Sequence, residues 1–143
     1  MAKEKTVISS KFKTQSSNQV QIPNDKKPYD LENRTAKFGE DIIVFIKIVP
    51  DNPIHRSLKQ QLIRSATSIG ANYMEADATE SKKDFKYKIA LCKKEAKESM
   101  HWLRMIATAQ PEYKQSCRIL WQEAHELVLI FSTIISGHKR SQS

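Results

Sequence analysis

The spacing of apolar residues is the feature that most restricts how this chain can fold. In the first of four segments these residues are separated by four and three positions in turn: Leu31, Thr35, Phe38, Ile42, Phe45 and Val49. This spacing places them on one face of an α-helix. Residues 54–76, 85–106 and 113–134 repeat the pattern. Only three glycines and five prolines occur in 143 residues, too few turn residues for a β-rich fold.

Start and stop signals separate the four segments. They are Pro50, the Asn52-Pro53 pair, a capping-box-like Ser81–Asp84, the Gln110-Pro111 break and Gly137 as a C-terminal cap. The connections are short, so consecutive helices must be antiparallel. The sequence therefore predicts an all-α, up-down-up-down antiparallel four-helix bundle over residues 29–138. Small residues around Gly70 indicate close packing of two helices rather than a ligand loop.

Both ends of the chain are polar. Residues 1–28 hold six lysines against Glu4 and Asp25, half of the formal net charge of +8. They carry too few apolar side chains to offset the entropy of ordering, which predicts a mobile basic tail. Residues 139–143 are expected to form a short C-terminal tail. No signal peptide is recognisable, and the longest apolar run, 127–135, is too short to span a bilayer. We therefore expect a cytoplasmic protein without membrane contact.

The sequence offers little catalytic chemistry. It contains no phosphate-binding glycine loop, zinc-protease motif or nucleophile elbow. Glu98 and His101 form one Glu-x-x-His, whereas di-iron bundles use two such motifs, and the helical register places His101 outward. Cys92 and Cys117 lie too far apart along their helices to meet, so we expect both to fill the core. No metal or cofactor is predicted.

Two groups of charged residues have a functional and a structural interpretation. The acidic group around the second inter-helix turn is explained better by helix capping than by a cation or basic partner: Glu75, Asp77, Glu80 and Asp84. Five lysines share an outer face of the third segment: Lys83, Lys86, Lys93, Lys94 and Lys97. This second group fits contacts with nucleic-acid phosphates and fits a solvated face equally well. No interleaved aromatic residue indicates base stacking.

A second set of apolar residues lies outside the main helical faces. Its members are Leu91, Trp102, Met105, Trp121, Val128 and Ile135. Exposed apolar patches of this kind mark an interface, so we predict that these residues join copies of the chain in a homo-oligomer. The alternative is a bundle core that is wider than the main face of each helix.

Several motifs resemble a known family. They are LENRT in the first segment, the continuous stretch QQLIRSATSIGANYMEADA in the second, and KKEAKESMHWL in the third. The chain resembles, from Tyr29 to Gly137, four-helix-bundle proteins first noted in intervening sequences of bacterial 23S rRNA genes. These are similar to the accessory proteins that accompany reverse transcriptases in diversity-generating retroelements. The basic tail before Tyr29 is a departure from a minimal member.

The resemblance implies a ring-like homopentamer without catalytic residues. For the accessory proteins it implies that a basic surface binds nucleic acid and a reverse transcriptase. We therefore expect a non-enzymatic oligomeric scaffold that binds RNA, DNA or a nucleic-acid-handling protein, with phosphate contacts from the five lysines and the tail. A protein-interaction module without nucleic-acid binding is the alternative, and a metalloenzyme on Glu98 and His101 is the third possibility.

Overall fold

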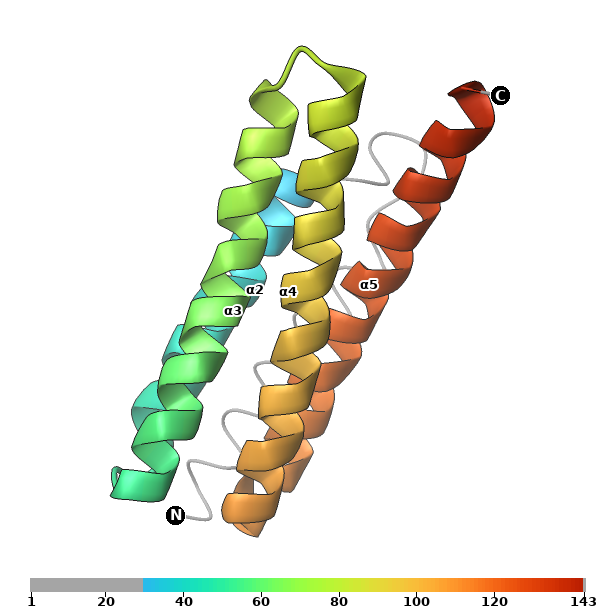
Figure 1. Ribbon diagram of the computed structural model, residues 1–143. Helices are drawn as coiled ribbons and strands as arrows, with labels where there is room; N and C mark the ends of the chain where they lie inside the picture. The colour runs from blue at the N-terminus through green and yellow to red at the C-terminus, as the bar shows by residue number, and fades with distance from the viewer. Residues whose placement is uncertain (1–29, 143) are drawn as a thin grey trace.

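The computed structural model describes residues 30–142, with side chains up to Gly137, so the predicted tail 1–28 lies outside the described residues. Four helices and one short 3₁₀ turn make up this part: α2 (Leu31–Ile48), α3 (Pro53–Ala78), α4 (Lys82–Ala109), η1 (Pro111–Tyr113) and α5 (Lys114–Gln142). Each helix runs antiparallel to the next, and α2 lies behind α3 in the view of Figure 1. The predicted all-α four-helix bundle is confirmed.

The predicted helix starts depend on side chains that accept hydrogen bonds from the first turn. The Asn52 side chain accepts from the His55 backbone N–H at 2.8 Å, and the Ser81 hydroxyl accepts from the Asp84 N–H at 3.2 Å. Asp30 accepts from the Asn33 N–H in the same way at the start of α2. These acceptors satisfy backbone donors that have no partner inside the helix. Both predicted starts are therefore explained by local chemistry.

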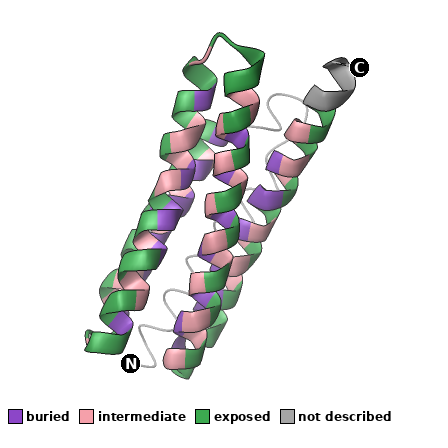
Figure 2. Ribbon diagram, viewed as in Figure 1, coloured by how far each residue is buried: buried purple, intermediate pink, exposed green. Residues whose placement is uncertain are grey.

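The core follows the predicted apolar faces, which point inward on all four helices (Figure 2). The predicted apolar face is wrong at one position, in the first turn of α3. Ile54 was expected in the core but is 69% exposed, and His55 is buried in its place. The His55 ring stays inside because its Nδ1 lies 2.8 Å from the Pro50 carbonyl oxygen and 3.0 Å from Asn52 Nδ2. Capping geometry therefore overrides the apolar spacing at this end.

Gly70 lies where α3 passes close to α2, as its small neighbours indicate. A Cβ placed on Gly70 would lie 3.5 Å from Thr35 Oγ1 and 3.6 Å from the Ala36 backbone nitrogen. Gly39 of α2 faces the Thr67 backbone at a similar distance. Backbone therefore packs against backbone at this crossing, and the Thr35 hydroxyl donates to the Leu31 carbonyl beneath it at 2.6 Å.

Gly137 does not end the last helix, which corrects the predicted C-terminal cap. Helix α5 continues to Gln142, so residues 139–142 of the expected tail are helical. In the described part of the chain no glycine has a positive φ angle, so the left-handed cap geometry is absent there. A glycine inside a helix costs only about 1 kcal/mol relative to alanine, which the helix tolerates.

Both cysteines are buried and unlinked, as predicted. Burial raises the pKa of each thiol, Cys92 and Cys117, to about 12. Among the described residues, no helix is both long enough and apolar enough to cross a membrane.

Candidate nucleic-acid interface

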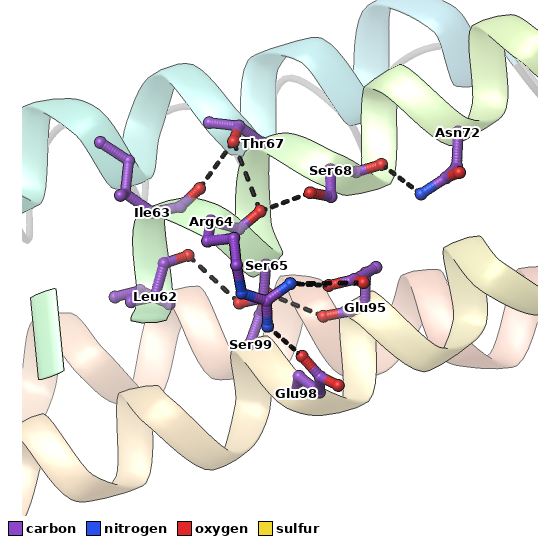
Figure 3. A network of polar contacts seen from close by, with 10 residues as sticks. All are labelled: Leu62, Ile63, Arg64, Ser65, Thr67, Ser68, Asn72, Glu95, Glu98 and Ser99. Carbon is purple, nitrogen blue, oxygen red and sulfur yellow. Dashed lines mark hydrogen bonds and ion pairs between the residues drawn. The ribbon is translucent and has the colours of Figure 1, made fainter. Parts of the chain in front are cut away.

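The carboxylates in the middle of α4 face α3, where they bind one arginine (Figure 3). Arg64 Nη1 lies 3.2 Å from a Glu95 carboxylate oxygen, and Arg64 Nη2 binds Glu98. Beside this group the hydroxyls of Ser65 and Ser99 meet at 2.9 Å inside the bundle. Both carboxylates of this stretch of α4 are therefore ion-paired with Arg64 on the side that faces α3.

The carboxylates of α5 face the opposite neighbour, α2. Arg34 donates from Nε and Nη2 to the two Glu123 oxygens, both at 2.9 Å, and Nη2 lies 3.3 Å from Glu126. The Arg34 and Glu123 side chains are 21% and 17% exposed, so the pair is partly shielded from water. The carboxylate of Glu123 raises the pKa of the Arg34 guanidinium through this hydrogen bond.

The five α4 lysines keep their positive charge unpaired. They lie on the outer side of α4, exposed or half-buried, and none forms an ion pair with a described residue: Lys83, Lys86, Lys93, Lys94 and Lys97. Lys88, which lies on the flank facing α3, pairs with Glu75 instead. The five unpaired lysines are therefore separated from the ion-paired side chains of α4, which face α3.

Part of this surface extends along the flank of α4 that faces α5. Lys86, Lys93, Lys97 and Arg104 are spaced by seven, four and seven residues, so they share one flank of the helix. Arg104 lines a groove between α4 and α5 with a volume of about 410 Å³. The row of three lysines therefore leads along α4 to this groove.

The basic groove between α4 and α5 combines cations with an apolar floor. Its full lining is Leu103, Arg104, Ala107, Lys114, Cys117, Arg118, Trp121 and Gln122. No carboxylate contributes to it. Burial keeps the Cys117 thiol neutral at physiological pH, with its pKa raised to about 12. Trp121 forms one wall, and the His125 ring stacks on it with centroids 5.2 Å apart and planes inclined by 19°.

The sequence did not single out Arg104, Lys114 and Arg118, which the fold brings together. A partial signal was present, because Arg104 follows Lys97 by seven residues and so continues the row of lysines. Lys114 and Arg118 come from the next helix. Their position opposite Arg104 depends on the rotation of α5 about its axis, which no spacing within one helix reveals.

The six predicted interface residues do not form one surface. Three of them lie on one flank of α4 together with Glu95 and Glu98: Leu91, Trp102 and Met105. Along the chain these five residues are separated by four, three, four and three positions, so they share one side of the helix. Trp121 belongs to α5 and lines the basic groove. Val128 and Ile135 follow Trp121 at seven-residue intervals, and Val128 is only 7% exposed in the single chain, so it belongs to the core. The remaining five are half-buried.

The residues considered for a metal site do not converge. Glu98 is bound to Arg64, while the exposed His101 ring lies against Trp102 at 4.8 Å in a T-shaped contact. In residues 30–137, no three His, Cys, Asp or Glu side chains are grouped to hold a metal ion. Of the acidic group, Asp84 lies in the first turn of α4, and Glu75 pairs with Lys88. Asp77 and Glu80 are exposed near the turn.

A second groove lies between α2 and α3 and differs in charge. It has a volume of about 330 Å³, and small residues such as Gly39, Gly70 and Ala71 line it. Glu32 and Glu40 are its acidic members. The charged residues of this lining are carboxylates, whereas those of the basic groove are cations, so the two grooves are opposite in charge.

Comparisons with known proteins agree with this fold. A crystal structure of a protein of unknown function from the S23 ribosomal protein family of Bacteroides thetaiotaomicron superposes with a TM-score of 0.66 and 25% sequence identity, covering 73% of this chain and 96% of the other. A comparison with curated protein sequences gives no significant match. The family model described as 23S rRNA-intervening sequence protein matches residues 29–133. With most of its length matched, the chain belongs to the 23S rRNA-intervening sequence protein family.

Proposed function

We propose that this protein is a non-enzymatic helical scaffold that binds RNA through the outer flank of α4. The observation that carries the proposal is the separation of charge on the bundle. Arg64 binds two carboxylates of α4 on the flank facing α3, and Arg34 binds two carboxylates of α5 on the flank facing α2. The five α4 lysines have no such partners, which favours an external polyanion.

A helix with unpaired lysines on one flank binds phosphates without reading bases. The Lys86–Lys97 part of the row spans about 16 Å at 1.5 Å per residue. Ammonium groups spread over this length can contact several phosphates of one strand. Binding of this kind releases counterions, so it weakens steeply with salt and depends little on sequence.

The proposal includes assembly of copies of the chain, with a pentamer as the state that the family resemblance implies. Half-buried apolar side chains on the α4 flank that carries Glu95 and Glu98 support it: Leu91, Trp102 and Met105. A ring of copies would multiply the basic flank and raise the avidity for a long RNA. A reverse transcriptase or another nucleic-acid-handling protein is the protein partner proposed for such a complex.

The test measures binding of a structured RNA by fluorescence anisotropy, and particle mass by light scattering, at several salt concentrations. Lys93→Glu with Lys97→Glu should weaken binding at least tenfold at low salt. The slope of log K against log salt should fall in size by at least 1, because two phosphate contacts are lost. Lys37→Glu with Lys47→Glu on α2 is the matched control, because it changes the net charge equally.

Three results would contradict the proposal. One is the absence of salt-dependent RNA binding by the unmodified protein. Another is an equal effect of the α2 and α4 pairs, which would mean that only the net charge matters. The third is an oligomer whose mass is unaffected by RNA at any salt concentration. This last result would favour the protein-interaction module.

A further inference from the structure

The basic groove between α4 and α5 has features that phosphate contacts alone do not require. A row of exposed lysines is sufficient for backbone contact. The basic groove adds a volume of about 410 Å³, an apolar floor and an aromatic wall. Binding sites for small organic ligands have this construction, with volumes that start at about 300 Å³.

We infer that the basic groove holds one unpaired nucleotide of a bound RNA, with its base against Trp121 and its phosphates on Arg104, Lys114 and Arg118. The inference deepens the proposed RNA-binding function and rests on it. Charge complementarity identifies the occupant, because every charged residue of the lining is a cation. An apolar peptide would leave these three charges without partners, whereas a nucleotide supplies both an aromatic plane and phosphate.

The Trp121 ring is positioned for stacking. His125 stacks on it with centroids 5.2 Å apart, one helical turn further along α5. Trp121 lines the groove together with Lys114, Cys117 and Arg118, whereas His125 does not belong to the lining. A base that entered the groove would therefore meet the Trp121 indole. Tryptophan faces accept any base, so the contact would not select a sequence.

The floor of the groove suits the plane and edge of a base. Leu103, Ala107 and Cys117 are apolar, and the raised pKa keeps the Cys117 thiol neutral. Gln122 is the uncharged polar member of the lining and offers both a donor and an acceptor. The floor therefore imposes no charge on the base, and the cations Arg104, Lys114 and Arg118 carry the electrostatic attraction.

The groove and the row of lysines form one continuous path. Lys97 precedes Arg104 by seven residues on the same flank, a separation of about 10 Å along the helix axis. A strand whose phosphates follow Lys86, Lys93 and Lys97 would therefore reach the groove without crossing to another face. A duplex keeps its bases stacked inside, so only an unpaired nucleotide can enter the groove.

The inference predicts a preference for single strands that depends on Trp121. Binding of a 12-nucleotide single-stranded RNA and of a duplex of equal length is measured by anisotropy at constant salt. The unmodified protein should prefer the single strand by about tenfold, the contribution of one stacked base. Trp121→Leu should remove this preference and leave duplex binding unchanged. Arg118→Glu, at an exposed position, is a second variant that should also weaken the single strand more than the duplex.

Tryptophan fluorescence supplies an independent readout, because Trp102 and Trp121 are the two tryptophans of the chain. The single-stranded RNA should quench emission in Trp102→Phe, which retains the groove tryptophan. It should leave emission nearly unchanged in Trp121→Phe. Circular dichroism and thermal unfolding establish that each variant is folded before it is used.

The outcomes separate this inference from the proposed function. Salt-dependent RNA binding without a preference for single strands, and without quenching of Trp121, would overturn the groove inference and leave the scaffold function standing. Absence of any RNA binding would overturn both. A fall in particle mass caused by Arg118→Glu without RNA would also overturn the inference, because another copy of the chain would then occupy the groove.

Discussion

At the level of single residues, Gly70 shows that close packing need not require glycine. A Cβ at this position would make ordinary contacts of 3.5–3.6 Å with Thr35 and Ala36. Alanine also removes the entropic cost of glycine in a helix. We therefore expect Gly70→Ala to raise the free energy of unfolding by about 0.5–1 kcal/mol, measured by urea denaturation. Gly70→Leu is the contrasting variant and should destabilise the protein, because its longer side chain must displace α2. A lower urea midpoint for the alanine variant would contradict this packing.

The two buried thiols give a residue-level prediction that depends on pH. Burial raises the pKa of Cys92 and Cys117 to about 12 from a reference value of 9.0. The unfolded chain therefore loses these protons first as the pH rises, and stability should fall between about pH 9 and pH 12. A Cys92→Ala, Cys117→Ala variant should show a smaller fall. At pH 8 a thiol reagent should react with Cys92, which is fully buried, only as fast as the protein unfolds, and rapid labelling of Cys92 in the native protein would contradict the burial.

At the level of helices, Arg34 links α2 to α5, which are far apart in the sequence. It donates two 2.9 Å hydrogen bonds to Glu123 in a partly shielded position. Hydrogen bonds to charged groups contribute about 1.5–3 kcal/mol, so Arg34→Ala should cost about 2 kcal/mol in urea denaturation. Glu123→Ala in the Arg34→Ala background should then cost little more. Arg56→Ala is the matched control without measurable effect, because the Arg56–Asp51 pair is exposed.

The helices were predictable from the sequence because their signals are local. Asn52 and Ser81 cap the helices that follow them, and each acts within three residues. Extrapolating the apolar spacing failed at Ile54, where the His55 side chain takes the inward position. Treating Gly137 as a stop failed because a helix can continue through glycine. The pairing of Arg34 with Glu123 depends on how two distant helices are rotated, which no local pattern contains.

The same reasoning applies to the candidate site. The shared outer position of the five α4 lysines could be predicted, because all five lie on one helix and their spacing alone determines which side they share. The basic groove could not, because α4 and α5 each supply part of its lining. Their antiparallel pairing places Arg104 opposite Lys114 and Arg118. A site within one helix can therefore be predicted from spacing, whereas a site between helices requires the packed structure.

At the level of the whole molecule, the bundle has chemically different faces that limit how copies can associate. Lysines cover the outer and α5-facing flanks of α4, so contacts between copies there would bring like charges together. Leu91 and Met105 lie on the flank of Glu95 and Glu98, whose carboxylates Arg64 already binds. This flank combines apolar side chains with carboxylates that are already ion-paired. It is therefore the face we expect to be buried between copies.

Leu91→Glu with Met105→Glu should lower the particle mass measured by light scattering, because two charges would enter an apolar contact. Helical content should stay unchanged, since both side chains are only half-buried in the single chain. Leu129→Glu is the matched control, because Leu129 is apolar and 52% exposed on a different helix. Dissociation by Leu129→Glu alone would place the contact on α5 instead. An unmodified protein that is monomeric at every concentration would contradict the assembly itself.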